Sequence, residues 1–429
     1  MTLWPIAILV FFFALGVPVA FAMVLAVIPY FWLDPYISVS VIAQKLIGNC
    51  ESISLMAVPF FIVAGSVMNY SGITERLMDL ADSIVGHFTG GLGQVNVVLS
   101  TLMGGISGSG AADCAQECKI LVPEMIKHGY DKPFCAAVTA ASACITPIIP
   151  PGVALVVFAC ICEVSVGKLL ASGYIPGLML CIAQMIVVYI ISKKRGYKSE
   201  RTHMMPIRVI LKKALGALWA LFLPFGLILA LRAGVCTATE GGVLMALYSA
   251  FVGKFIYKTL DFKQLPAIMV EAALSTAPVM IILCAANVFS YYMTWENIPS
   301  ALTAALLSAA SNKYVFLLAC NVMFLLLGMF MDGTACMIII APLLAPVVET
   351  LGINMIHFGL VVCLNIGLGA ITPPFGTYIF LVSGTLKMKT SDMIKDLIPF
   401  IVACIIVLFL VTYIPWFSTT IPKLMYGSV

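Results

Sequence analysis

The chain has 429 residues, of which 62% are hydrophobic and only 10% are charged. Because a soluble globular domain usually carries about 25% charged residues, this composition excludes a soluble enzyme and indicates an integral membrane protein. The basic residues behind the net charge of +4 gather in loops, above all in segment 192–213, which the positive-inside rule places in the cytoplasm. No soluble scaffold surrounds them, so we expect the lipid bilayer and no nucleic acid as a partner.

The first apolar run extends from Leu3 to Leu33 and has neither a basic leader nor a cleavage site of small residues, so we expect it to be retained. It is too long for one straight helix across a hydrocarbon core of about 30 Å. Gly16-Val17-Pro18 interrupts it, and proline disfavours a continuous helix. The run predicts either one kinked helix or two short ones, and the side on which the N-terminus lies stays open.

The next broken element runs from Gly93 to Met125. Its middle reads MGGISGSGAAD at residues 103–113, with four glycines and two serines, which are poor helix formers. The segment 127–132 that follows is basic and is expected in the cytoplasm. Counting spans back from the loop 192–213 therefore predicts a re-entrant hairpin that enters from the cytoplasm, with 103–113 at its tip.

Prolines break the span that follows. The segment from Phe134 to Cys162 is expected to cross the membrane, and its middle reads ITPIIPPG at residues 145–152. Each proline removes an amide donor and frees the carbonyl one turn earlier. This span, which precedes a further one from Leu169 to Ile191, therefore predicts unpaired backbone groups at mid-depth.

The second half of the chain repeats this order. The region 314–349 must start and end on the outer side if the later spans are to reach the basic cluster 387–395, so it predicts a second hairpin with MDGT at residues 331–334 as its tip. ITPPFG at residues 371–376 breaks the span after it. Spans are expected at 214–231, 237–255, 267–293, 358–383 and 397–417.

The two hairpins are related by one constant offset in residue number. Four positions match at this offset, namely Gly105, Gly110, Pro123 and Gly129 with Gly328, Gly333, Pro346 and Gly352. Because one hairpin opens to the cytoplasm and the other to the outside, the halves form an inverted repeat, the usual build of a secondary transporter. The alternative is that glycine and proline are simply frequent in membrane helices. The predicted fold class is an all-α polytopic membrane protein: an inverted repeat with two re-entrant helical hairpins and two broken transmembrane helices.

The breaks predict binding sites, because backbone groups unpaired in lipid are tolerated only where they line a polar cavity. Freed carbonyl oxygens suit a hard cation such as Na+, and helix N-termini at a tip favour an anion. We expect two Na+ ions, transported rather than structural, on either side of one anionic substrate. The first Na+ site would use Gly105, Ser107, Ser109, Gly110, Ala143 and Thr146, and the second Gly328, Asp332, Gly333, Gly369, Thr372 and the carbonyl of Phe375. The substrate would lie against Ser107, Ser109, Thr334, Pro150 and Pro374.

Acidic residues near the tips allow more than one interpretation. Asp332 could be an ion ligand or an acceptor that caps the turn. Asp113, Glu117 and Lys119 lie just past the first tip, where Glu117 and Lys119 could be neutralised within the hairpin or by snorkelling.

Several motifs together resemble the large membrane (M) subunit of the tripartite ATP-independent periplasmic (TRAP) transporters. They are GISGSGAAD, LVPEMIKHGYDKPF and IIPPG in the first half, and MDGT, APLLAP and ITPPFG in the second. The resemblance covers essentially the whole chain. It implies a multi-pass protein of the bacterial inner membrane, similar to divalent-anion/sodium symporters, in which an elevator-like transport domain carries both hairpins and a sodium gradient drives uptake.

The resemblance also implies partners and a substrate class. A small four-helix membrane (Q) subunit and a soluble periplasmic binding (P) protein, which delivers a carboxylate substrate, would be separate chains. Gly152 stands where many members have serine, and CKILVPEM with ITPIIPPG is closer to the sialic-acid branch than to the C4-dicarboxylate branch. The implied division is scaffold helices at 1–91, transport repeats at 92–168 and 313–395, scaffold helices with the basic loop at 169–312, and a C-terminal helix at 396–429.

Two other functions remain to be weighed. Gly105-Ile-Ser107-Gly108 fits the pattern around the serine of rhomboid-type intramembrane proteases, but such a serine needs a histidine on a neighbouring span. The four histidines, His87, His128, His203 and His357, are all expected in loops or amphipathic stretches, so we expect no enzyme. An ion channel is the other alternative, because hairpin pairs also build pores.

Overall fold

The computed structural model describes residues 4–33, 35–53, 55–199, 201, 203–309, 312–330 and 333–427, and every regular element among them is helical. The first half of the chain forms α1 (Trp4–Ala14), α2 (Val19–Leu33), α3 (Ser40–Cys50), α4 (Ala57–Tyr70), α5 (Ile73–Val85), α6 (Gly91–Gly104), α7 (Gly110–Lys127), α8 (Lys132–Ser142), α9 (Val153–Ile161), α10 (Val166–Ser172) and α11 (Tyr174–Arg195).

The second half continues in the same way. It forms α12 (Ile207–Arg232), α13 (Ala238–Phe251) with a π-helical turn (Val252–Ile256), a 3-10 turn (Phe262–Gln264), α14 (Leu265–Trp295), α15 (Ile298–Ala309), α16 (Lys313–Phe330), α17 (Gly333–Thr350), α18 (Met355–Gly369), α19 (Thr377–Thr385), α20 (Thr390–Tyr413) and α21 (Trp416–Tyr426).

The first apolar run is two helices rather than one kinked helix. It breaks between Ala14 and Val19, where Pro18 has no amide hydrogen to donate to the preceding turn. The helices α1 and α2 have 11 and 15 residues, so at 1.5 Å per residue each is shorter than a hydrocarbon core of about 30 Å. They pack against each other and share a small core cluster with α14.

A second bend was not expected from the sequence. The helices α4 and α5 meet at an angle of 71°, with Gly72 between them in the left-handed region at φ +71°. A β-carbon there would lie 2.6 Å from Cγ2 of Thr259. Because glycine adopts this backbone conformation without steric cost, Gly72 permits both the turn and the close approach of the loop after α13.

Both predicted hairpins are present. The helices α6 and α7, here called hairpin 1, pack against each other on either side of the turn 105–109, and α16 and α17 form hairpin 2 in the same way. Part of the second tip, Met331 and Asp332, lies outside the described residues. Each hairpin is followed by a broken helix: α8 and α9 flank break 1 (residues 143–152), and α18 and α19 flank break 2 (residues 370–376).

The helices confirm the offset between the two halves. The second arm of each hairpin begins at Gly110 and at Gly333, and the helix after it begins at Lys132 and at Met355, so both pairs are separated by the offset that relates the tip glycines. Each break also contains one cis peptide bond, Pro150-Pro151 in break 1 and Pro373-Pro374 in break 2. The repeat therefore holds for local backbone structure as well as for glycine and proline positions.

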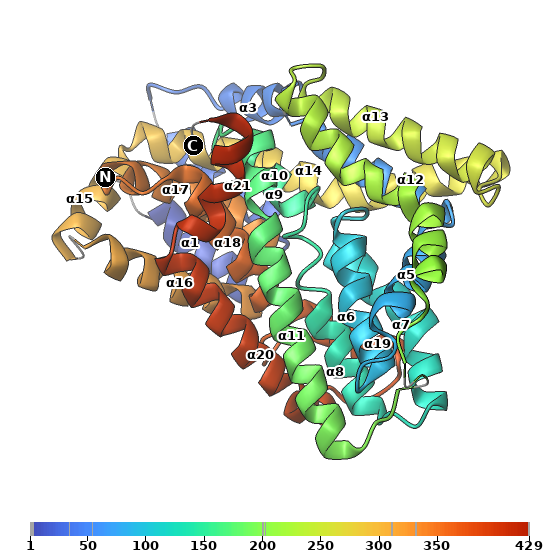
Figure 1. The fold of residues 1–429 in the computed structure, drawn as a ribbon. Helices are drawn as coiled ribbons and strands as arrows, with labels where there is room; N and C mark the ends of the chain where they lie inside the picture. The colour runs from blue at the N-terminus through green and yellow to red at the C-terminus, as the bar shows by residue number, and fades with distance from the viewer. Residues whose placement is uncertain are drawn as a thin grey trace.

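Figure 1 shows α11 passing through the middle of the molecule, with α6, α7 and α8 on one side of it and α16, α18 and α20 on the other. Contacts of α11 with α6, α8 and α20 agree with this view. By length and composition, five helical stretches in the described part of the chain could cross a membrane, or six if α4 and α5 count as one bent span. One of the five is α17, although the predicted topology makes it an arm of hairpin 2.

Candidate functional site

The tip of hairpin 1 is held by main-chain contacts to break 1. The carbonyl of Gly108 accepts a hydrogen bond from the amide of Val153 at 3.2 Å. A β-carbon on Gly108, whose φ is +59°, would lie 2.6 Å from the carbonyl oxygen of Pro151. Only glycine allows this approach without strain, so the sequence of the tip is matched to the break that it touches.

The serines of this tip cap and brace the turn. Ser109 is the N-cap of α7, and its Oγ accepts a hydrogen bond from the amide of Ala112 at 3.5 Å. The buried Oγ of Ser107 accepts one from the amide of Ser109 at 3.4 Å. Both hydroxyl oxygens keep a further lone pair, so capping the turn does not exclude a ligand.

Break 1 lies directly against this tip. β-Carbons placed on Gly104, Gly105 and Gly110 would lie 3.1 Å from the carbonyl oxygen of Thr146, 3.5 Å from that of Pro150 and 2.5 Å from that of Ala143, respectively. Among the described residues no hydrogen bond ends on the carbonyls of Ala143 or Thr146. The structure thus brings together all six residues predicted for the first cation site, together with Pro150, and leaves two carbonyl oxygens available.

The first site also contains a carboxylate that the predicted ligand set lacks. Asp113 is 1% exposed, and its Oδ2 accepts a hydrogen bond at 2.7 Å from the hydroxyl of Thr146, which also lies 3.3 Å from the carbonyl oxygen of Ser100. Oδ1 of Asp113 is buried and has no hydrogen-bond partner among the residues that the structure describes. In the sequence, the one local indication that Asp113 belongs to this site is its position one turn after Gly110. Its contact with Thr146 joins residues 33 positions apart and could not be predicted.

The second site is tighter and less polar in its described part. A β-carbon on Gly328 would lie 3.1 Å from Cα of Gly369, so α16 and α18 touch backbone to backbone. A β-carbon on Gly333 would lie 2.2 Å from Cγ2 of Ile366. The structure therefore brings Gly328, Gly333 and Gly369 together, whereas Asp332, the only acid predicted for this site, lies outside the described residues.

The remaining residues predicted around break 2 lie at its accessible side. Thr372 uses its hydroxyl to donate a hydrogen bond to the carbonyl of Leu368 at 2.6 Å, within its own segment. Phe375 is 53% exposed and Pro374 is also exposed, whereas Thr334, on the first turn of α17, is half-buried. Break 2 is thus reached from outside the protein, while break 1 is buried against hairpin 1.

The two breaks are adjacent in space. A β-carbon on Gly367 of α18 would lie 3.1 Å from the carbonyl oxygen of Cys144 in break 1. Tyr378, at the start of α19, brings its hydroxyl against Gly110, where a β-carbon would lie 2.3 Å from it. The two halves of the chain therefore place their interrupted segments side by side, at the tip of hairpin 1.

Residues 6–417 match the family model described as "Tripartite ATP-independent periplasmic transporter, DctM component". The chain belongs to this family. It is 35% identical over 416 residues to the sialic acid TRAP transporter large permease protein SiaM of Vibrio cholerae, with 96% of each chain covered. It is 34% identical to the sialic acid TRAP transporter permease protein SiaT of Haemophilus influenzae, with 96% of this chain and 66% of SiaT covered, so it spans slightly less than two thirds of that relative.

A further relative agrees with this assignment, and a solved structure shares the fold. The C4-dicarboxylate TRAP transporter large permease protein DctM of Pseudomonas aeruginosa is 33% identical, with 90% of each chain covered. The crystal structure of the Alcanivorax borkumensis YdaH transporter aligns with a TM-score of 0.61 at 16% identity, over 96% of this chain and 98% of that one. The predicted family and the all-helical membrane transporter fold are thereby confirmed.

Because the TRAP family consists of transport permeases, the chain is a transporter subunit and not an enzyme. One expectation that was used against the protease alternative was nevertheless wrong. His357 does not lie in a loop or amphipathic stretch but is buried in α18, where Nδ1 lies 2.7 Å from Oγ of Ser418 and Nε2 lies 3.1 Å from the carbonyl oxygen of Thr412. Ser418 and Thr412 are both far from Ser107 in the sequence. Their hydrogen bonds link the His357 imidazole of α18 to the C-terminal segment of the chain.

Of the two alternatives left open for Glu117 and Lys119, neutralisation within the hairpin or by snorkelling, the structure separates the two residues. Glu117 is 2% exposed and bonded to Ser100, whereas Lys119 is exposed, and no ion pair of the described residues joins them. On a helix, residues two apart point in different directions. Lys119 therefore reaches the surface and leaves Glu117 inside.

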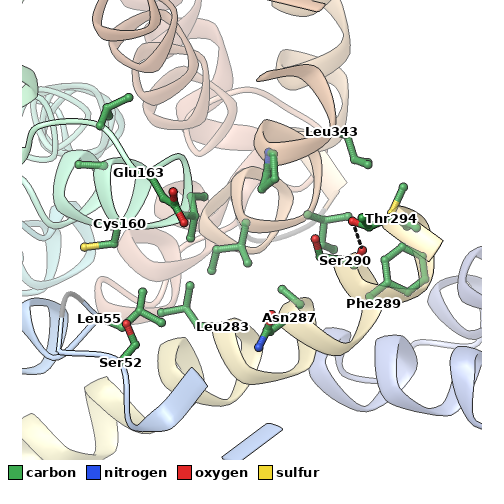
Figure 2. Close-up of a pocket in the computed structure, with 18 of the residues that line it drawn as sticks. Ser52, Leu55, Cys160, Glu163, Leu283, Asn287, Phe289, Ser290, Thr294 and Leu343 are labelled. Carbon is green, nitrogen blue, oxygen red and sulfur yellow. Dashed lines mark hydrogen bonds between the residues drawn. The ribbon is translucent and has the colours of Figure 1, made fainter. Parts of the chain in front are cut away.

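A cavity of about 1000 Å³ lies elsewhere, between the N-terminal half of the chain, α14 and α17. Figure 2 shows Glu163 on one wall, Asn287 and Ser290 on α14 opposite it, and Leu343 of α17 above them. Of the residues predicted to bind Na+ or the substrate, none that the structure describes lines this cavity. Sequence reasoning missed it because its walls come from segments far apart in the chain.

Proposed function

We propose that this TRAP permease subunit imports a carboxylate substrate through the bacterial inner membrane, coupled to the inward movement of two Na+ ions. The observation that carries the proposal is the meeting of hairpin 1 with break 1 and with Tyr378, which follows break 2, because this meeting gathers free carbonyl oxygens, hydroxyls and the Asp113 carboxylate at one point. Oxygen donors of this kind are the ligands that hard cations prefer. A helix N-terminus at the same point, that of α7, favours an anionic group beside them.

The substrate proposed first is sialic acid, ahead of a C4-dicarboxylate. SiaM and SiaT, whose names refer to sialic acid, are 35% and 34% identical to this chain, and the C4-dicarboxylate protein DctM is 33% identical. Both substrate classes carry a carboxylate, which is the group that the proposed site would bind. The proposal includes two partners, a small four-helix membrane (Q) subunit and a periplasmic binding (P) protein that delivers the substrate.

The proposed mechanism is of the elevator type. In the predicted topology, the loops before α10, before α13 and after α14 lie on the outer side, and residues from all three line the 1000 Å³ cavity. The tip of hairpin 1 and both breaks lie outside this cavity. This separation supports a carrier in which the part that bears the hairpins moves relative to the walls formed by α2 and α14. A substrate in the cavity would then reach the hairpin tips only after that part has moved.

Uptake in proteoliposomes tests the proposal. The chain would be reconstituted with its small subunit, and labelled sialic acid or succinate supplied with the purified binding protein under an imposed inward sodium gradient. We expect saturable uptake that requires both the binding protein and the gradient, with sialic acid preferred. Uptake driven equally well by potassium would overturn sodium coupling, and flux that does not saturate or need the binding protein would indicate a channel.

A further inference from the structure

Glu117, a buried acid on the second arm of hairpin 1, has no role in the proposed coordination of Na+. We propose that Glu117 binds a proton that it releases when a cation occupies the first site, so that sodium binding is linked to pH. This inference rests on the proposed sodium-coupled function and adds a second ion to it.

The surroundings of Glu117 are polar but uncharged. Its Oε1 accepts a hydrogen bond from Oγ of Ser100 at 2.8 Å, and its Oε2 lies 3.4 Å from Oγ of Ser142. Ser142 also lies 2.9 Å from Oδ1 of Asn96, whose Nδ2 donates to Oγ1 of Thr139 at 2.9 Å. All of these side chains are fully or almost fully buried.

No cation in the described part of the chain compensates a charge on Glu117. The helix α7 packs against α6, α8 and α19. The groups that α6 and α8 turn toward Glu117 are the neutral side chains of Asn96, Ser100 and Ser142. The one titratable side chain in α19 is that of Tyr378, which lies against Gly110. The ionisable group that acts on Glu117 comes from its own helix and is the Asp113 carboxyl, another acid.

An isolated carboxylate in such surroundings is costly. Burying an ionised group without a partner of opposite charge costs several kcal/mol, and Asp113 lies one helical turn away on the same face. Two carboxylates at this spacing repel each other when both are ionised. The neutral form of Glu117 avoids both costs, and the neighbouring hydroxyl oxygens can accept its proton in a hydrogen bond.

The route between Glu117 and the first cation site is short. Ser100 donates its hydroxyl to Glu117, and its carbonyl oxygen lies 3.3 Å from Oγ1 of Thr146, which in turn bonds Oδ2 of Asp113. A cation beside the free Oδ1 of Asp113 would offset the negative charge that opposes ionisation of Glu117. Cation binding therefore favours loss of the Glu117 proton, and by linkage a higher pH strengthens cation binding.

The test measures sodium affinity as a function of pH. The half-saturating Na+ concentration for uptake would be determined at pH 6, 7 and 8 for the wild type and for Glu117→Gln, which keeps the shape of the side chain without titrating. In the wild type this concentration should fall by at least about fivefold from pH 6 to pH 8, the lower end of typical coupling between two sites. In Glu117→Gln it should change by less than about twofold.

A control and a second readout separate this linkage from loss of folding. Glu124→Gln changes an exposed acid on the same helix and should behave as the wild type. The purified wild-type complex in weakly buffered detergent should release protons on addition of Na+ but not of choline, and this measurement needs no variant. A pH dependence that survives in Glu117→Gln, or is absent from the wild type while uptake remains sodium-driven, would overturn the inference. Absence of sodium-driven uptake at every pH would instead overturn the proposed function.

Discussion

Hairpins 1 and 2 are alike in backbone but not in chemistry. Their second arms begin at matching positions of the repeat, Gly110 and Gly333, and both pack against a broken helix. Hairpin 1 buries Asp113 and Glu117 within a network of hydroxyls, whereas the matching positions of hairpin 2 are Cys336 and Ile340. The repeat therefore supplies the same backbone arrangement twice, and the two hairpins differ in the side chains that they offer to a ligand.

The largest expected effect comes from removing the charge at the first site. Asp113→Asn should raise the half-saturating Na+ concentration roughly 10- to 100-fold, because a contact to a charged group contributes about 1.5–3 kcal/mol and each 1.4 kcal/mol is tenfold. Sodium titration of uptake at saturating substrate measures it. Cys336→Ala, at the matching position of hairpin 2, is the control and should shift the value less than about twofold. Equal shifts in both variants would show that the charge is not what distinguishes the hairpins.

A smaller effect is expected from the threonines of the two breaks. Thr146 donates to the Asp113 carboxylate, whereas Thr372 donates to a carbonyl of its own segment. Thr146→Val should therefore weaken apparent sodium affinity about tenfold, and Thr372→Val about threefold or less. The same titration compares them. An unchanged sodium response in both variants would argue against both proposed sites.

The packing of the two tips can be compared by adding one carbon atom to each. A methyl group on Gly110 meets the carbonyl oxygen of Ala143, which is backbone, whereas one on Gly333 meets the Cγ2 methyl group of Ile366, which is a side-chain atom. Gly110→Ala should lower the free energy of unfolding by about 2–3 kcal/mol and Gly333→Ala by about 1 kcal/mol. Thermal unfolding in detergent would compare the two variants. An equal loss of stability would contradict the expected difference between backbone and side-chain contacts at the two tips.

The smallest difference is expected where the repeats do match in chemistry. Ser142 and Asn365 occupy matching positions of the repeat, and each donates to Oδ1 of an asparagine on the first arm of its hairpin, Asn96 and Asn321, at 2.9 and 2.7 Å. Replacing either with alanine leaves one buried amide oxygen unpaired. Each variant should lose about 1 kcal/mol of stability, and Asn365→Ala should keep its sodium dependence. Thermal unfolding would measure the loss of stability in each variant, and sodium titration of uptake would show whether Asn365→Ala keeps its sodium dependence.

The sequence predicted what depends on local pattern. Glycine clusters and proline runs mark backbone that cannot continue as a helix, so the tips at 103–113 and 331–334 and the breaks at 145–152 and 371–376 could be placed without a structure. Their repetition at one offset then predicted the architecture. The family resemblance carried the same information for the chain as a whole.

Contacts between distant segments could not be predicted in this way. Nothing local shows that Thr146 bonds Asp113, or that Tyr378 reaches Gly110. The 71° bend at Gly72 was missed because it contains one glycine and no proline cluster. How Glu117 and Lys119 are neutralised was left open for a related reason, since closeness in sequence does not put two side chains on one helix face.

Among the described residues, the two buried carboxylates of hairpin 1, Asp113 and Glu117, have no ion-pair partner, whereas the buried Asp396 of α20 is paired with Arg195. This difference has an electrical consequence for a carrier of the proposed kind. A membrane voltage acts on each elementary charge with about 2.3 kcal/mol per 100 mV. In a cell with a negative interior, a mobile body that bears an ionised Asp113 without its cation is driven outward. Because the proposed binding of Na+ releases the Glu117 proton, the exchange leaves the charge of the first site unchanged, and the voltage acts on its empty and occupied forms alike.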